Sequence, residues 1–206
     1  MLRRMLTGAF AALVMVASAH AQDVGAGAGR VEVGVFPGGG MFFTESGKGG
    51  ESDFLNYALG ASFAVNVNRW IGLEAEGGGT VGVRQSFNVG RTAFADHRTP
   101  STLVYAGNVV VHPGGRDRAV VPYLTGGIGG LTFTPWNDAK SVGIASYETF
   151  LTANVGAGIK WFSTRHFGIR GDYRFIAVKS RDTAPAFFGS EDRYGHRVQA
   201  GLIFTY

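Results

Sequence analysis

The sequence has no cysteine, few prolines and few charges: 6 of its 206 residues are proline and 17% are charged. The lack of cysteine excludes disulfides, cysteine-ligated metal sites and an anchor attached through a lipidated cysteine. The chain also has no run of lysine or arginine that could follow a phosphate backbone. Without Arg3 and Arg4 its net charge falls from +4 to +2, so we expect no nucleic-acid partner.

Long apolar runs are missing everywhere except at the N-terminus. Residues 1–21 combine a basic start, an apolar stretch over residues 9–17 and the small-x-small end Ala19-His20-Ala21. This pattern predicts a secretory signal that is cleaved before Gln22. The apolar stretch is too short for a retained membrane helix, and the rest of the chain offers no other candidate.

Glycine and aromatic residues are abundant instead, with 33 glycines and 13% aromatics. Residues 196–206 illustrate how they are used. Val198, Ala200, Leu202, Phe204 and Tyr206 form an apolar row that alternates with a polar or small row, which only Ile203 interrupts. Alternation with a period of two predicts a β-strand with two different faces.

Seven further segments show the same alternation, and the connections between them run long, short, long, short, long, short, long. The eight predicted strands cover residues 30–36, 54–67, 70–83, 102–112, 120–133, 150–162, 167–178 and 196–206. Short turns on one side and long loops on the other are typical of outer-membrane barrels. We therefore predict an all-β fold, an eight-stranded antiparallel up-and-down transmembrane β-barrel over residues 22–206, with residues 41–53, 84–101, 134–148 and 179–194 as loops. The face of strand 120–133 stays ambiguous, because glycines occupy both rows.

Charged residues fall on one row of these strands and are almost absent from the other. The charged row carries Glu32, Glu74, Glu76, Lys160, Arg170, Asp172, Arg174 and Arg197. Such charges would be costly in lipid, so the row is predicted to face the barrel interior, where four acids can pair with four bases. The network either holds the barrel closed or forms a narrow ion path through shifting pairs.

Aromatic residues gather near the strand ends, as two interfacial girdles require. The turn side has Trp70, Trp161, Phe167 and Tyr206, and the loop side has Phe54, Tyr57, Phe133, Phe150 and Phe175. We expect all of them at the two membrane surfaces.

With these features together, the chain resembles the small outer-membrane β-barrel family of the OmpA/OmpX type. The most specific match is the terminal motif Gln199-x-Gly201-x-x-Phe204-x-Tyr206, which looks like that family's C-terminal assembly signal. The resemblance implies that the outer-membrane barrel assembly machinery recognises this strand, and that the protein lies in the outer membrane of a Gram-negative-type bacterium. Since no segment follows Tyr206, we expect neither a peptidoglycan-binding domain nor a cell-wall tether.

Catalytic residues, a metal site and a cofactor site are not indicated by any motif. A lipid A deacylase of this architecture would need a His-x-Ser-Asn pattern, but His166 precedes Phe-Gly and His196 precedes Arg-Val. We expect the histidines to be solvated or interfacial. The glycine clusters introduce no helix, so a phosphate-binding loop is excluded.

The predicted loops carry the charges that remain for contact with lipopolysaccharide or another surface: Arg84, Arg91, Arg98, Arg181, Asp96, Glu191 and Asp192. The leading hypothesis is a monomeric, non-catalytic outer-membrane protein with a structural or surface-interaction role (adhesion or envelope integrity), in contact with membrane lipids. A narrow porin-like channel and a soluble, lipocalin-like ligand-binding barrel are the alternatives. The lipocalin-like barrel would require the apolar row inside and the charged row outside.

Overall fold

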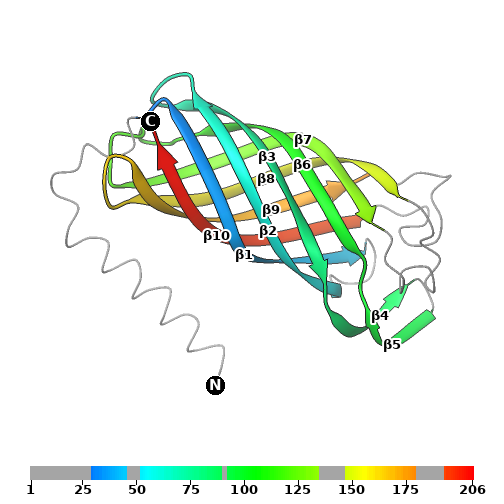
Figure 1. The fold of residues 1–206 in the computed structure, drawn as a ribbon. Coiled ribbons are helices and arrows are strands. Elements are labelled where there is room, and N and C mark those ends of the chain that lie inside the picture. The colour runs from blue at the N-terminus through cyan, green and yellow to red at the C-terminus, as the bar shows by residue number, and fades with distance from the viewer. Residues whose placement is uncertain (1–28, 46–51, 90–91, 135–146, 180–192) are drawn as a thin grey trace.

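A single closed sheet forms the body of the protein. The computed structural model describes residues 29–45, 52–89, 92–134, 147–179 and 193–206. Its eight barrel strands are β1 (Val31–Glu45), β2 (Ser52–Asn66), β3 (Ile71–Gly82), β6 (Ser101–Val111), β7 (Val120–Thr134), β8 (Glu148–Phe162), β9 (Phe167–Val178) and β10 (Arg193–Thr205). Each pairs with its neighbours in an antiparallel manner, and β10 closes the barrel against β1 (Figure 1). The predicted eight-stranded antiparallel barrel is confirmed.

The two ends of the barrel differ. At the turn end lie the C-terminus, the start of β1 and the connections 67–70, 112–119 and 163–166 (Figure 1). The opposite end, called the loop end, holds the last residues of β1, β3, β7 and β9 and the first residues of β2, β6, β8 and β10. The signal predicted for residues 1–21 lies outside the described residues. No helix in the described part of the chain is long and apolar enough to cross a membrane.

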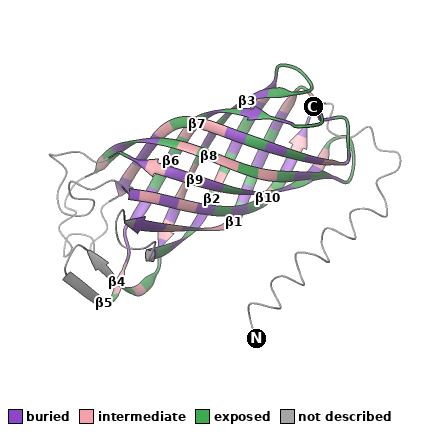
Figure 2. Ribbon diagram, turned by 180° about the vertical axis from the view of Figure 1, so that it is seen from behind, coloured by how far each residue is buried: buried purple, intermediate pink, exposed green. Residues whose placement is uncertain are grey.

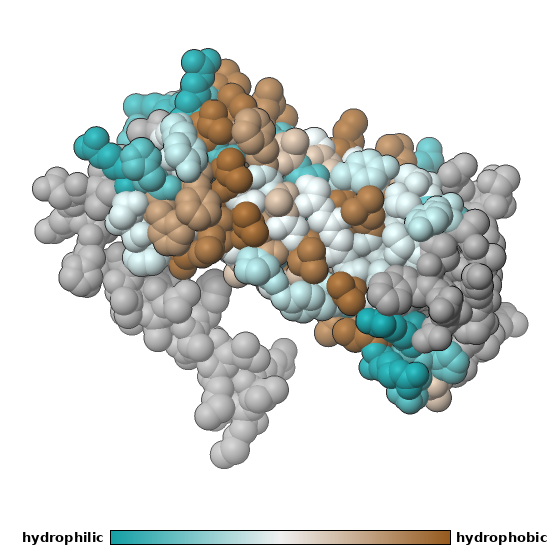
Figure 3. Space-filling model, in the orientation of Figure 1, coloured by the Kyte–Doolittle hydropathy of each residue, from teal (hydrophilic) through white to brown (hydrophobic). Residues whose placement is uncertain are grey.

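More buried and more exposed residues alternate along most of each barrel strand (Figure 2). In β3, Leu73 is 54% exposed whereas its neighbour Glu74 is 3% exposed. Apolar side chains thus cover the outside and charged ones the inside, which is the reverse of a soluble barrel. The lipocalin-like alternative is therefore wrong. Figure 3 shows hydrophobic residues on the barrel wall and hydrophilic ones mainly toward its two ends.

Strand β7 resolves the ambiguous face of residues 120–133. Its odd positions point inward, including Val121 and Tyr123, and Leu124 and Ile128 are exposed on the outside. The inward row also contains Gly127 and Gly129, so both rows do contain glycine. The larger side chains, rather than the glycines, distinguish the two faces.

Two predicted loops are wrong. β1 continues through the glycine-rich segment to Glu45 and β2 begins at Ser52, so residues 41–45 and 52–53 belong to strands. A register shift between Val35 and Gly38 lets β1 pass its Pro37 without ending. The other predicted loop, residues 84–101, contains a hairpin of β4 (Arg84–Val89) and β5 (Thr92–Arg98), which pair with each other outside the barrel sheet.

Candidate functional site

The barrel interior is the candidate site, because the strands direct the charged side chains into it. All eight residues of the predicted charged row lie inside, and none is more than 8% exposed. They come from β1, β3, β8, β9 and β10, which the sequence separates but barrel closure brings together. We call these eight residues, with Arg116, the charged section.

The centre of the charged section is built around Glu74 and two arginines. Arg170 and Arg174 both donate to the Glu74 carboxylate, Arg174 from 2.8 Å. Arg174 also lies 3.0 Å from Glu76 and 3.5 Å from Asp172, and Arg197 pairs with Glu76. Each cation therefore has an anionic neighbour in a place where an unpaired charge would be severely destabilising.

Tyr123 connects this centre to β7. Its hydroxyl donates to Asp172 Oδ2 at 2.8 Å and accepts from Arg170 Nε at 2.6 Å, and its ring lies 4.6 Å from the Arg170 guanidinium. The sequence did not reveal this residue as part of the network, because the face of its strand could not be assigned. An inward-facing tyrosine contributes to packing through its ring and to hydrogen bonding through its hydroxyl.

A second group of charges closes the interior toward the turn end. Lys160 donates to Glu32 at 2.5 Å, and Arg116 donates to the same carboxylate at 3.1 Å. Sequence reasoning missed Arg116 because it lies in a connection and not on an alternating strand. Gly114 and Gly115 adopt φ of 95° and 80° there, a conformation that glycine adopts readily, and the buried Arg116 follows directly.

His112 lies beyond the end of β6 and is fully buried against this group. Its Nε2 is 3.2 Å from the Lys160 ammonium, so Nε2 must accept and the ring is neutral. Burial, reinforced by the neighbouring Lys160 charge, lowers the pKa of His112 to about 4. The expectation that the histidines are solvated or interfacial is therefore wrong for His112.

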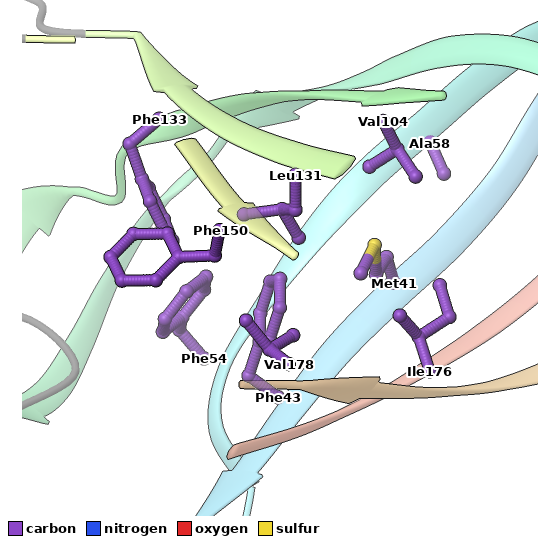
Figure 4. Packing of buried hydrophobic residues seen from close by; sticks show 10 residues of the cluster. All are labelled: Met41, Phe43, Phe54, Ala58, Val104, Leu131, Phe133, Phe150, Ile176 and Val178. Atoms are coloured by element: carbon purple, nitrogen blue, oxygen red, sulfur yellow. The ribbon is translucent and has the colours of Figure 1, made fainter. Parts of the chain in front are cut away.

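Toward the loop end the interior becomes apolar (Figure 4). The side chains of this apolar section point into one common space and are at most 6% exposed: Met41, Phe43, Phe54, Ala58, Val104, Leu131, Phe133, Phe150, Ile176 and Val178. The rings of Phe133 and Phe150 meet edge to face at 5.9 Å. Phe54, Phe133 and Phe150 were expected in the outer aromatic girdle and lie inside instead. Of the aromatic residues expected there, Tyr57 is exposed on the outer wall.

The residues of the predicted assembly motif divide between the two faces of β10. Gln199 is buried inside and Gly201 also faces inward, whereas Phe204 and Tyr206 face outward. A Cβ on Gly201 would overlap the Val35 carbonyl and lie 2.8 Å from Phe36 Cα, beside the register shift of β1. Ile203 fills the turn end of the interior with Val121 and Phe162.

Two further described histidines, His166 and His196, make local contacts. His166 Nδ1 lies 2.9 Å from the Thr205 carbonyl, and His196 Nδ1 lies 2.8 Å from the Tyr173 hydroxyl on the outer face. No cluster of three metal-ligating side chains occurs among the described residues.

Three of the predicted loop charges can be placed, and all three lie on or beside the β4–β5 hairpin. Arg84 pairs with Asp96 at 3.1 Å, with both side chains exposed, and Arg98 donates to the Gly82 carbonyl at 2.9 Å. Arg91, Arg181, Glu191 and Asp192 lie outside the described residues. Of the three described loop charges, the structure brings Arg84 and Asp96 into direct contact.

Comparison with known proteins agrees with this architecture. Neisserial surface protein A superposes with a TM-score of 0.60 at 11% identity, covering 85% of this chain and 97% of that protein. The outer membrane protein OprG from Pseudomonas aeruginosa has a TM-score of 0.52 at 13% identity, covering 89% and 99%. No curated protein sequence matches. These two likenesses show the fold alone.

The family is shown by the sequence itself, since residues 9–204 match the family described as the outer membrane protein beta-barrel domain. The match covers nearly the whole chain. The apolar outer wall of the barrel is therefore the surface that contacts membrane lipid. The chain belongs to the outer membrane β-barrel family and is an integral protein of the outer membrane of a Gram-negative-type bacterium.

Proposed function

We propose that the protein is a monomeric, non-catalytic barrel that strengthens the envelope or binds surfaces through its loop end. The observation that carries this proposal is the filled interior. The charged section and the apolar section occupy successive lengths of the same barrel, with side chains that are nearly all inaccessible. A barrel of eight strands has room for its own side chains and little more.

Contact with a ligand is then left to the ends of the barrel. Loops on a rigid scaffold commonly carry binding residues. The β4–β5 hairpin extends from the loop end and displays the exposed Arg84–Asp96 pair (Figure 1). Lipopolysaccharide phosphates and acidic polymers on another surface are ligands that such arginines can recognise.

The test replaces the hairpin and leaves the barrel unchanged. Residues 84–98 are exchanged for a short turn, and cells with either version are compared for surface attachment and for resistance to detergent and large antibiotics. We expect equal amounts of heat-modifiable barrel and a loss of attachment or resistance. Full function of the shortened protein would contradict a role for this loop.

Assembly of the barrel is proposed to depend on its terminal strand. Phe204 and Tyr206 point outward at the turn end, where the barrel assembly machinery could bind them before the strand pairs with β1. Deletion of Tyr206 should lower the amount of barrel inserted in cells more than the stability of barrel already folded. Equal losses in both measurements would contradict an assembly signal.

A narrow channel is the second candidate, and a specific feature of the charged section favours it. Arg174 has three carboxylates within 3.5 Å, so its pairs can exchange without leaving it unpaired. Asp172 Oδ1 and Arg174 Nε are buried without a hydrogen-bond partner among the described residues, and buried polar atoms of this kind commonly bind water. The apolar section, however, blocks the same route.

Planar bilayers separate the two candidates. A channel predicts discrete conductance that changes when Glu74 or Arg170 is replaced. The closed scaffold predicts silence from folded protein, and silence would also remove the channel hypothesis.

A further inference from the structure

The turn end carries an open pocket that the proposed loop function does not use. It has a volume of about 420 Å³ and lies where three segments meet: the start of β1, the 67–70 turn and the 112–119 connection. We call it the rim pocket; the lining residues that matter here are Arg30, Val67, Asn68, Arg69, Arg116 and Asp117.

The rim pocket has an excess of positive charge. Three arginines line it, but only one acidic residue, Asp117. Arg116 is already engaged by Glu32, but Arg30 and Arg69 are exposed, and no carboxylate in the described part of the chain pairs with either. An arginine fork matches the oxygens of a phosphate group, so the pocket offers two available forks to such an anion.

The apolar residues around the pocket favour an amphiphilic ligand over a soluble anion. Val67 is 62% exposed, and Trp70 and Ile71 are each 41% exposed, on the lipid-facing wall next to the pocket. The Arg69 guanidinium lies 4.6 Å from the Trp70 ring, which joins the charged rim to that wall. Exposed tryptophans mark the level of lipid headgroups, and short turns lie on the periplasmic side.

We propose that the rim pocket binds one anionic phospholipid of the periplasmic leaflet, with its phosphodiester between Arg30 and Arg69. The acyl chains would lie along Val67, Trp70 and Ile71. Asp117 would accept a hydrogen bond from a headgroup hydroxyl and would repel a second phosphate. The pocket therefore fits phosphatidylglycerol, which has one phosphodiester and a hydroxylated headgroup.

Fluorescence of Trp70 reports directly on the occupant. The protein has three tryptophans, so Trp136→Phe and Trp161→Phe leave Trp70 as the reporter. This protein is folded into phosphatidylcholine vesicles that contain a fixed fraction of brominated phosphatidylglycerol, brominated phosphatidylethanolamine or brominated phosphatidylcholine. Bromine quenches tryptophan on contact, and each measurement is normalised to the same lipid without bromine.

We expect phosphatidylglycerol to be preferred over phosphatidylcholine, with each arginine contributing about fivefold. Arg30→Gln and Arg69→Gln should each reduce the preference by that factor. Arg165→Gln is the matched control, because Arg165 is exposed on the separate 163–166 turn at the same end. Heat-modifiable migration verifies that every variant is folded.

Several results would overturn the proposal. An equal loss with Arg165→Gln would show a diffuse charge effect of the whole rim. Equal quenching by phosphatidylglycerol and phosphatidylcholine would show that no anion site exists, and an equal preference for phosphatidylethanolamine would assign the pocket to a zwitterion. Removal of the preference by millimolar inorganic phosphate would indicate a site for a soluble anion. The rim pocket lies at the turn end and the β4–β5 hairpin at the loop end, so none of these results depends on the loop function.

Discussion

The charged section and the apolar section fill neighbouring lengths of one interior, but they depend on their contacts differently. In the charged section, Glu74 accepts from two arginines, so each charge relies on particular partners at particular distances. In the apolar section, Leu131 is stabilised by packing against the apolar side chains around it. Ion pairs in a low-dielectric space are therefore sensitive to the loss of one atom, whereas apolar packing is sensitive to volume.

The largest effect is expected from Glu74→Gln, which keeps the shape of the side chain and removes its charge. Arg170 and Arg174 would then lose the carboxylate that they share. Breaking a buried ion pair in this way lowers the free energy of unfolding by about 3–5 kcal/mol. Urea unfolding in phospholipid vesicles measures the loss.

The matched control for Glu74→Gln is Asp96→Asn, which removes the acid of the Arg84–Asp96 pair. These side chains are 66% and 77% exposed, so the expected loss is below about 1 kcal/mol. Asn also tolerates the positive φ of 54° at this position. Similar losses for the two variants would mean that the charged section is as well hydrated as the surface.

Leu131→Ala probes the apolar section. Leu131 is fully buried, and its truncation should cost about 2–5 kcal/mol through lost contacts and the cavity left behind. Leu131→Met keeps the volume and should cost less than about 1.5 kcal/mol. The same unfolding assay applies, and equal costs would show that the section is loosely packed.

The charged section could be predicted from the sequence because two constraints coincide. Residues such as Arg170, Asp172 and Arg174 alternate with apolar neighbours, and lipid excludes charge from the other face. Their grouping inside follows from these two constraints together. Their individual partners do not, because these depend on how far each strand is staggered when the barrel closes.

The apolar section escaped prediction for two physical reasons. The register shift in β1 changes its inward parity, so that Phe36 faces inward at an even position and Met41 and Phe43 at odd ones. In addition, Phe133 and Phe150 are suited equally to a membrane interface and to a packed interior. Arg116, in the charged section, was also missed, because a connection has no alternation that could reveal where its side chains point.

Gly201→Ala tests whether the terminal motif has a structural role in addition to assembly. The added Cβ would overlap β1 beside its register shift, and overpacking of this kind costs about 1–3 kcal/mol. Gly171→Ala on β9 is the control, because its Cβ would be 4.0 Å from the Gln199 carbonyl, an ordinary contact. Unfolding of purified barrels measures both. Unchanged stability with reduced insertion in cells would assign Gly201 to assembly alone.

A pH dependence is expected at the turn end of the charged section. Burial beside Lys160 lowers the pKa of His112 from about 6.5 to about 4, with Glu32 and Arg116 as the other charges that face it. A lowered histidine pKa means that the unfolded chain takes up the proton first. Stability from this residue is therefore complete above pH 6.5 and falls as the pH drops toward 4, by at most about 1.4 kcal/mol per pH unit.

His112→Gln isolates this contribution, because Gln can still accept a hydrogen bond from Lys160 but does not titrate. The free energy of unfolding is measured for both proteins from pH 7.5 to pH 4, and the difference between them is plotted. Groups common to both proteins cancel, so the difference should shift in favour of His112→Gln as the pH falls. A difference that does not change with pH would mean that His112 takes up its proton inside the folded barrel. The charged section would then adapt to an added charge, and its pairs would be less specific than the contrast with the apolar section implies.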